Sequence, residues 1–321
     1  VKAATGEVSD ERELGGTEMH ASVSGVIEYL ADDDDHGLEM AREVVDRLGW
    51  DEQLAPRAER TFAAPKHSPD ELAGVVPTDY MVPYDVREVV ARIVDGSDFL
   101  DFKSRYGSST VCMQADIMGF ACGIIGNNGP IDTAGANKAG QFFQLCDQAQ
   151  IPLIFLHNTT GFMVGKEYEQ AGMVKHGSKM IQAVANARVP KIGLHIGASF
   201  GAGNYAMGGL PYKPDFLFSW PNATTGVMAG QSAARTMTTV AEARAERTGK
   251  PVDRDVLAQQ ETRIRQIFDV QEDIFYTSGR CLDHGIIDPR DTRKVLGFCL
   301  ETIAEAKART VQPNAFGVAR L

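Results

Sequence analysis

The sequence predicts an α/β fold with parallel strands, and a repeat gives the clearest support. "IPLIFLHNTTG" from Ile151 and "VPKIGLHIGAS" from Val189 share the pattern [IV]-P-x-I-x-L-H at a spacing of 38 residues. Each copy follows a helical stretch and runs from an apolar strand into a loop that contains glycine. A third apolar strand, "DFLFSW", begins at Asp215. Successive turns of strand, loop and helix imply a parallel sheet with right-handed crossovers.

The chain divides into three parts by composition. In "DDDDHGLEMAREVVDRLGW", aspartates stand in cap position and Leu38, Ala41, Val44, Val45 and Leu48 share one face, which predicts a helix. Residues 51–80 follow as a linker, because this stretch is rich in proline and has weak periodicity. We therefore expect domain boundaries that separate residues 1–50, 51–80 and 81–321.

The third part opens with a helix and a strand in "YDVREVVARIVDGSDFLDFKSRYG". "TVCMQADIMGFACGIIGNNG" then predicts two strands joined by a tight turn at Gly119, because the stretch is rich in β-branched and apolar residues. Two helices are predicted from apolar faces with helical spacing. Their face residues are Ala139, Phe142, Phe143, Cys146 and Ala149 in the first, and Met173, Gly177, Met180, Ile181 and Val184 in the second.

The C-terminal end of the chain is predicted to be helical. A charged helix pair spans Gln231 to Phe268, and a last helix starts at "DPRDT", where Asp288 caps and Pro289 takes the first turn. The inner face of the last helix carries Leu296, Cys299, Leu300 and Ile303.

Composition excludes several classes of function. The formal net charge of −11 and the absence of a Lys/Arg cluster argue against nucleic-acid binding. No apolar run approaches the roughly 18 residues of a membrane span, and the first residues lack the apolar segment of a signal peptide. We expect a cytoplasmic protein, or one of the mitochondrial matrix if the source is eukaryotic.

The titratable clusters predict no metal site. The five cysteines are scattered without a C-x-x-C pair, which is typical of buried reduced thiols rather than of disulfides or zinc. Helix capping explains "DDDDH" from Asp32 more simply than a cation does.

The glycine-rich stretch "IGASFGAGNYAMGG" from Ile196 has three possible explanations. Gly201 and Gly203 fit a dinucleotide fingerprint, but its third glycine is Ala206 and no acidic residue follows at the usual distance. A tight structural turn is the second explanation. The third is an oxyanion site, because unpaired first-turn amides beside small side chains let a ligand oxygen approach.

The corresponding loop of the preceding repeat, "NTTGFMVGKEYEQAG", places Gly161 and Gly165 on either side of Phe162 to Val164. Apolar residues at the end of a strand indicate a flat apolar partner such as a ring system. Alternatively, Phe162 fills the core. His157 and His195 end the matching strands, where a structural, hydrogen-bonded role is favoured over an acid–base one. No G-x-S-x-G elbow occurs, so backbone donors are better catalytic candidates than a side-chain triad.

Several of these stretches together resemble one family. "GFMVG", "GASFGAGNYAM" and "FSWPNATTGVMAGQSAA" resemble the carboxyltransferase (β) subunits of biotin-dependent acyl-CoA carboxylases, most closely the branch that acts on 3-methylcrotonyl-CoA and geranyl-CoA. "GIIDPRDTRKVLG" resembles the C-terminal signature of that family. The resemblance implies a crotonase-like fold, a superhelix of ββα turns. It assigns residues 1–50 to the end of an N-terminal carboxyltransferase domain and 81–321 to the C-terminal one.

The resemblance also implies chemistry and site residues. Carboxybiotin on a separate carrier would give its carboxyl group to an acyl-CoA or enoyl-CoA, with biotin itself as the base. Ala202 and Gly203 would supply catalytic oxyanion amides, and Tyr205 would influence substrate specificity. A bulky residue at Gly203 would abolish transfer and leave the fold intact. The residues that would bind biotin are Gly161, Phe162, Gly165 and Gly201.

The same resemblance predicts partners and rivals. We expect a biotin carboxylase and biotin carboxyl carrier (α) subunit, a homo-oligomer of hexamer type, and an active site shared with an N-terminal domain that this sequence lacks. This stretch alone would then be inactive. The alternatives are the carboxyltransferase subunit of a biotin-dependent acyl-CoA decarboxylase, and a non-catalytic CoA-binding or assembly subunit of the same fold.

Overall fold

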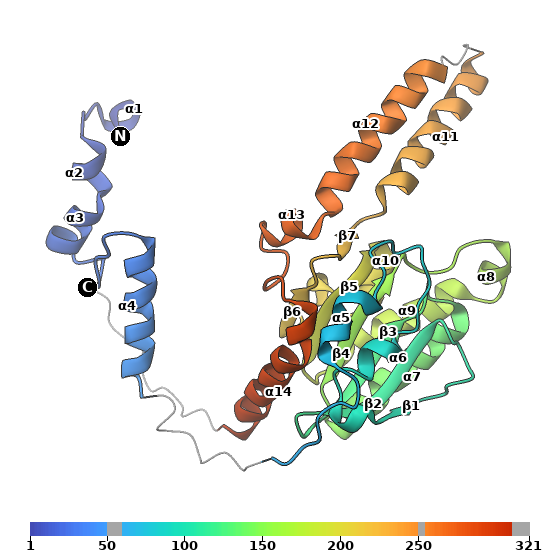
Figure 1. Ribbon diagram of the computed structural model, residues 1–321. Helices are drawn as coiled ribbons and strands as arrows, with labels where there is room; N and C mark the ends of the chain where they lie inside the picture. Colours follow the sequence, from blue (N-terminus) through green and yellow to red (C-terminus); the bar gives the residue numbers. More distant parts are fainter. Residues whose placement is uncertain (50–59, 250–253, 310–321) are drawn as a thin grey trace. The chain divides into compact units, whose positions relative to one another are not determined.

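The computed structural model of the 321-residue chain describes residues 1–49, 60–249 and 254–309 (Figure 1). The described residues before position 50 form one compact unit. Those from Arg60 to Arg309 form a second, the α/β unit, which carries every candidate site residue.

The N-terminal unit is helical. Its longest helix, α4, starts where the sequence predicts, since the Asp33 side chain accepts a hydrogen bond of 2.8 Å from the backbone N–H of His36. None of the α4 residues is buried, and Leu38 and Val45 of its apolar face are 58% and 60% exposed. The helices of this unit are α1 (Lys2–Thr5), α2 (Glu11–Gly15), α3 (Thr17–Met19), a π-helical turn (His20–Ser24) and α4 (Asp34–Arg47).

A seven-stranded sheet organises the α/β unit. Along the sheet the order is β1-β2-β3-β4-β5-β6, and β7 pairs with the C-terminal end of β5. The pairs β1–β2 and β2–β3 are antiparallel, whereas β3–β4, β4–β5 and β5–β6 are parallel, as the repeat predicts. The strands are β1 (Phe99–Asp101), β2 (Thr110–Ile117), β3 (Phe120–Asn127), β4 (Leu153–Thr159), β5 (Lys191–Phe200), β6 (Phe216–Ser219) and β7 (Thr224–Gly226).

The turn between β2 and β3 lies where the sequence predicts it. Met118 and Gly119 both have positive φ, 51° and 77°, as a two-residue hairpin turn with the right twist requires. The Asp95 carboxylate accepts hydrogen bonds from both of their backbone N–H groups, at 2.9 and 2.8 Å. Arg293 pairs with Asp95 at 2.6 Å, and both side chains are largely buried. This ion pair therefore ties the hairpin to the last helix.

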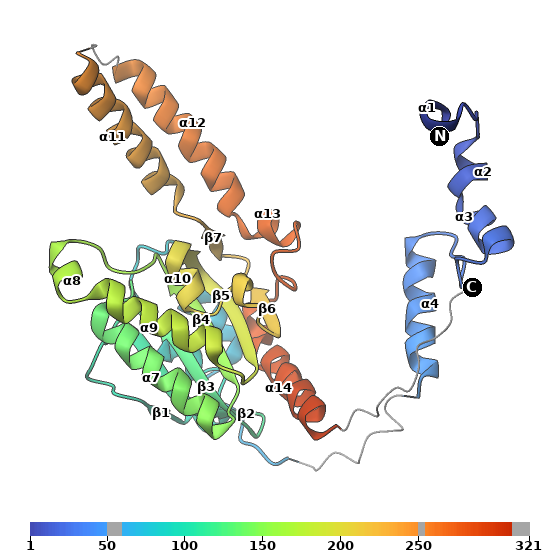
Figure 2. The same ribbon diagram turned by 180° about the vertical axis from the view of Figure 1, so that it is seen from behind.

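Helices cover both faces of the sheet (Figures 1 and 2). On one face, α7 and α9 pack with Phe142, Phe143 and Met180 in the core, as their predicted apolar faces require, although Ala149 is exposed. The other face is covered by α5, α6 and α14. These helices are α5 (Leu72–Val75), α6 (Arg87–Val90), α7 (Thr133–Ala149), α9 (Met173–Asn186) and α14 (Thr292–Ala308), and smaller helices are α8 (Lys166–Gln170), α10 (Gly201–Ala206) and α13 (Ile274–Ser278).

The C-terminal helices follow the predicted pattern. Asp288 accepts a hydrogen bond of 2.9 Å from the N–H of Arg290, and Pro289 opens a single 3₁₀ turn (Pro289–Asp291) from which α14 continues. Leu296 and Leu300 of α14 are buried against the sheet. The charged pair forms a helical hairpin of α11 (Gly230–Thr248) and α12 (Arg254–Glu272), which extends away from the sheet (Figures 1 and 2).

The stretch expected to be a linker contributes to the core in its second half. Leu72 and Val76 are 1% and 7% exposed and pack against the sheet. Arg60 donates a hydrogen bond of 2.8 Å to the carbonyl of Gly119 and stacks over Phe120. Residues 51–59 of that stretch lie outside the described residues. Prolines at wide spacing indicate an irregular path, but an irregular path can still bury apolar side chains.

The two repeat strands are longer than predicted. β4 continues past His157 to Thr159, and β5 continues five residues past His195 to Phe200. The last residues of β5 are held from two sides, because Ser199 pairs with Thr159 of β4 and with Thr225 of β7. The residues expected to begin a glycine loop are therefore still strand, and both histidines lie inside the sheet.

Candidate functional site

The two glycine loops predicted at the ends of β4 and β5 meet in space. A Cβ atom built on Gly203 would lie 2.8 Å from the Cα of Gly161 and 3.0 Å from the Cγ2 of Thr159. The Gly161 loop is held from its other side by Ile131, whose N–H donates a hydrogen bond of 2.9 Å to the carbonyl of Gly161. The repeat therefore places two bare backbone segments against each other at one edge of the sheet.

The turn from β5 into α10 requires glycine at its first position. Gly201 has φ of 50°, and a Cβ atom there would lie 2.8 Å from the carbonyl oxygen of Val227. No described side chain caps α10, so the N–H groups of its first turn are not used by a cap. Ala202 is exposed and Gly203 is buried. The amide hydrogens of this turn are thus left uncapped by side chains, beside an exposed residue with a small side chain.

The loop after β4 is shaped by two further glycines. Gly161 and Gly165 have φ of 131° and 119°, which residues with a Cβ rarely adopt. The hydroxyl of Thr159 accepts from the N–H of Gly161 at 3.2 Å and donates to its carbonyl at 3.1 Å. Gly165 precedes α8, and a Cβ atom there would meet nothing within 4 Å. Space around Gly165 is therefore open, and only its backbone conformation demands glycine.

Phe162 points to the core rather than away from it. A Cβ atom on Gly177 of α9 would lie 3.3 Å from its ring, and Phe162 packs against the core cluster between the sheet and α7 and α9. Its side chain is half-buried, whereas Val164 in the same loop is 79% exposed. The geometry favours the core-filling alternative for the inner face of the ring and leaves only its outer part to a ligand.

Tyr205 extends from α10 to the surface. Its side chain is 45% exposed, and its ring packs edge to face on that of Tyr212, with centroids 5.9 Å apart. Tyr205 therefore stands one turn along the helix that begins with Gly201.

His157 and His195 form part of a buried polar network beneath α10. The rings are edge to face, with centroids 4.8 Å apart. Nδ1 of His157 lies 2.9 Å from the Ser199 hydroxyl, and Nδ1 of His195 lies 3.1 Å from the Ser219 hydroxyl. Burial lowers the pKa of His157 well below its usual value and that of His195 to about 4, so both rings are neutral near pH 7. Buried neutral histidines support the structural role.

Sequence reasoning missed the partners of these histidines. His157, His195 and Ser219 occupy matching positions on β4, β5 and β6. That register could have been found by aligning "IFLH", "IGLH" and "FLFS", which end at these three residues. Asp283 accepts a hydrogen bond of 2.6 Å from the Ser219 hydroxyl. It lies 64 residues further along the sequence, so no local pattern predicts this contact.

Most of the cysteines are unsuited to act as nucleophiles. Four of the five are buried as predicted, and Cys281 is exposed. Burial raises the pKa of Cys112 and Cys146 to about 12, so these thiols stay protonated. Within residues 1–49, 60–249 and 254–309, no three His, Cys, Asp or Glu side chains gather as metal ligands would.

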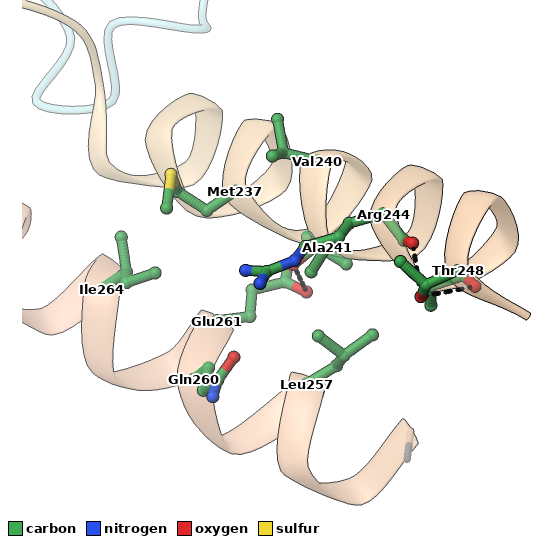
Figure 3. Close-up of a pocket in the computed structure, with 11 residues that line it drawn as sticks. Met237, Val240, Ala241, Arg244, Thr248, Leu257, Gln260, Glu261 and Ile264 are labelled. Carbon is green, nitrogen blue, oxygen red and sulfur yellow. Dashed lines mark hydrogen bonds between the residues drawn. The ribbon is translucent and has the colours of Figure 1, made fainter. Parts of the chain in front are cut away.

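A cavity of about 450 Å³ lies elsewhere, between α11 and α12 (Figure 3). Its lining residues all belong to these two helices, with Met237, Leu257 and Ile264 as apolar walls. Thr238 donates a hydrogen bond of 3.3 Å to Glu261 across it. None of the predicted site residues lines this cavity.

Among the helices that the structure describes, none is long and apolar enough to cross a membrane.

Comparisons with known proteins agree with this architecture. The probable biotin-dependent acyl-coenzyme A carboxylase β2 subunit of Mycobacterium tuberculosis is 47% identical over 325 residues, which cover all of this chain and 60% of that protein. The 3-methylcrotonyl-coenzyme A carboxylase β1 subunit of the same organism is 45% identical over 321 residues, again 100% of this chain and 60% of the relative. The chain thus spans about 60% of the length of these curated relatives.

Solved structures give the same result for the fold. The β subunit of geranyl-CoA carboxylase from P. aeruginosa superimposes with a TM-score of 0.82 at 51% identity, over 99% of this chain and 60% of that one. The transcarboxylase 12S hexamer structure with methylmalonyl-coenzyme A matches with a TM-score of 0.66 at 31% identity, over the same shares. The fold is the crotonase-like fold of these carboxyltransferases.

The family described as "Carboxyl transferase domain" matches residues 1–318 of the 321. A match of this extent, together with relatives above 40% identity over the whole chain, leaves one assignment. This chain belongs to the carboxyl transferase domain family.

Proposed function

We propose that this chain is the C-terminal carboxyltransferase part of a biotin-dependent acyl-CoA carboxylase β subunit. The observation that carries the proposal is the contact of two bare backbone segments, at Gly161 and Gly203, beside the uncapped first turn of α10. Membership in the carboxyl transferase domain family supports it, because relatives that share the whole length of this chain are carboxylase β subunits.

The amide of the exposed Ala202 and the neighbouring amide of Gly203 are proposed as the oxyanion donors on the biotin side. Carboxybiotin, when bound, would supply the carboxyl group, and the amides of Ala202 and Gly203 would face its ureido oxygen. Fixed backbone N–H groups stabilise developing charge without reorganising. The residues present fit such a group, because α10 has no side-chain cap and the nearest facing residue, Gly161, has no side chain to block approach.

Gly161, Gly165 and Gly201 are proposed to shape the biotin pocket through their backbone. Each has a positive φ, so the loop path depends on glycine at all three positions. Phe162 would contribute the outer part of its ring, and the exposed Tyr205 would contact the acyl chain. We propose an enoyl-CoA of the 3-methylcrotonyl-CoA type as substrate, because relatives at 42% to 45% identity are named for that substrate.

Residues 1–50 are proposed as the end of an N-terminal carboxyltransferase domain and residues 81–321 as the C-terminal one, with 51–80 between them. The thioester of the acyl-CoA would be held by the N-terminal domain of another subunit, in a hexamer that works with a biotin-carrying α subunit. The transcarboxylase 12S neighbour assembles as a hexamer, which supports this choice of assembly. The compartment proposed is the cytoplasm, or the mitochondrial matrix in a eukaryote.

Carboxyl transfer by the full-length β subunit with its biotinylated α subunit tests the proposal. Labelled bicarbonate, ATP and a panel of acetyl-, propionyl-, 3-methylcrotonyl- and geranyl-CoA would be supplied. We expect the label to appear in the products of 3-methylcrotonyl-CoA and geranyl-CoA before it appears in those of acetyl- and propionyl-CoA. No labelled acyl-CoA from any of the four, with carboxybiotin formed normally on the α subunit, would show that this chain is not the carboxyltransferase.

Ala202→Leu tests the oxyanion assignment within the same assay. Ala202 is exposed, so a larger side chain is accommodated by the fold but covers the amide that the ligand must reach. The expected loss of kcat is on the order of 10²–10³-fold, as for removal of one oxyanion donor. Ala202→Ser is the matched control, because it keeps the small volume and the amide. Equal activity of the two variants would place the donors elsewhere.

A further inference from the structure

One side chain of α10 joins this short helix to the core of the sheet. The amide nitrogen of Asn204 donates a hydrogen bond of 2.8 Å to the hydroxyl of Ser199 on β5 and approaches Nε2 of His195 at 3.5 Å. Its other side is enclosed, because a Cβ atom on Gly209 would collide with the Asn204 side chain. The Asn204 side chain is therefore fixed from two directions, and α10 with it.

The contacts of His195 form a hydrogen-bond chain that ends in a buried carboxylate. The Ser219 hydroxyl donates to Oδ2 of Asp283 at 2.6 Å, so it can only accept from Nδ1–H of His195 at 3.1 Å. With its proton on Nδ1, the neutral ring presents a lone pair at Nε2, the atom that faces the NH₂ group of Asn204. Each donor in this chain thus meets an acceptor, in a direction set by Asp283.

Apart from the half-buried Asn204, the members of this hydrogen-bond chain lie out of water. Ser219 and Ser199 are fully buried, His195 is 3% exposed and Asp283 is 8% exposed. Burial lowers the pKa of His195 despite the carboxylate beyond Ser219, so its neutral form persists at neutral pH. Hydrogen bonds in such surroundings hold their geometry, because each unpaired group would carry the full cost of desolvation.

We propose that Asn204 is a positioning residue for carboxyl transfer: the chain Asp283–Ser219–His195–Asn204, with Ser199, fixes the orientation of α10 and hence of the Ala202 and Gly203 amides. The inference rests on the proposed function. Asn204 would touch neither substrate, and it acts through the helix whose first turn supplies the donors. An oxyanion site needs donors already held in place when charge develops, and such fixation is what a two-sided amide contact provides.

Asn204→Asp is the sharpest variant. It keeps the shape of the side chain but replaces both N–H donors by acceptors, which face the Ser199 hydroxyl and the lone pair of His195. With the full-length protein and its biotinylated partner, we expect kcat to fall by about 10- to 100-fold while KM for acyl-CoA stays within about twofold, since misplaced donors affect mainly the transition state. Ser219→Ala removes a link of the hydrogen-bond chain that lies one residue further from α10. It should give a smaller fall of kcat in the same direction.

Asn222→Asp is the control. Asn222 is half-buried, and its side chain donates a hydrogen bond of 3.1 Å to the carbonyl of Ile196 on β5 rather than to α10. Its kcat should match that of the unaltered protein. The ¹⁵N shifts of His195 give a second readout, because the Nδ1–H form should dominate in the unaltered protein and lose its preference in Ser219→Ala.

The experiment distinguishes failure of the positioning role from failure of the proposed function. If Asn204→Asp keeps kcat within about twofold of an active unaltered protein, or loses no more than Asn222→Asp at the same loss of Tm, the positioning role is overturned. If the unaltered protein itself transfers no carboxyl group, the proposed function fails, and this inference fails with it.

Discussion

Gly203 and Gly161 are in backbone contact: a Cβ atom on Gly203 would lie 2.8 Å from the Cα of Gly161. Gly161 belongs to the loop after β4, and Gly203 belongs to α10, which follows the neighbouring parallel strand β5. Their contact explains why neither segment carries a side chain at this point. It also changes the expectation for substitutions, because a bulky residue at Gly203 cannot leave the surrounding fold intact.

Gly203→Ala should lower both the stability and the proposed carboxyl transfer. The added methyl group meets backbone, which cannot move aside as a flexible side chain can, so we expect a loss of about 1–3 kcal/mol in the free energy of unfolding. Urea unfolding of the full-length protein measures it. Gly74→Ala is the matched control, since Gly74 lies in a helix with open space around its Cα and should gain about 0.5–1 kcal/mol. Equal stability of Gly203→Ala and the unaltered protein would contradict the close approach.

Phe162→Ala should destabilise the α/β unit. The ring packs on α9 at Gly177 and is half-buried, so its removal leaves a cavity and should cost about 2–3 kcal/mol, somewhat less than for a fully buried phenylalanine. Thermal or urea unfolding gives the measurement. Val164→Ala, in the same loop but at 79% exposure, should change stability little. A Phe162→Ala protein that keeps its stability and only weakens biotin binding would assign the ring wholly to the pocket.

Stability should fall as the pH falls below about 6.5. His195 has a pKa lowered to about 4 by burial, against an ordinary value of 6.5, and that of His157 is lowered well below 6.5. Between the two values the unfolded chain binds protons that the folded chain does not, so acid favours unfolding. Each such proton contributes about 1.4 kcal/mol per pH unit.

Urea unfolding at pH 7, 6 and 5 would measure that slope. His195→Gln removes one of the two protons and should flatten the profile relative to the unaltered protein. The Asp283 carboxylate acts in the opposite sense, since it favours the charged ring, and is outweighed by burial. A profile of unchanged steepness in His195→Gln would mean that other groups cause the acid sensitivity.

Much of the fold could be predicted because its signals are local. The pattern shared by the segments from Ile151 and Val189 predicts parallel strands, the turn at Gly119 predicts the hairpin, and Asp288 with Pro289 predicts the start of the last helix. The lengths of β4 and β5 could not be predicted in the same way. The composition of residues 197–200 is typical of a loop. These residues form the end of β5 only because they pair with β4 and β7.

The candidate site was likewise predictable only in part from local signals. The sequence by itself determined which residues are bare, since Gly161, Gly165, Gly201 and Gly203 are visible as letters, and the family they belong to. Tertiary structure decided which of them meet, that Phe162 turns toward α9, and that Asp283 reaches His195 through Ser219. The reason is physical: backbone conformation and periodicity depend on neighbours along the chain, whereas contacts depend on the register of strands far apart in it.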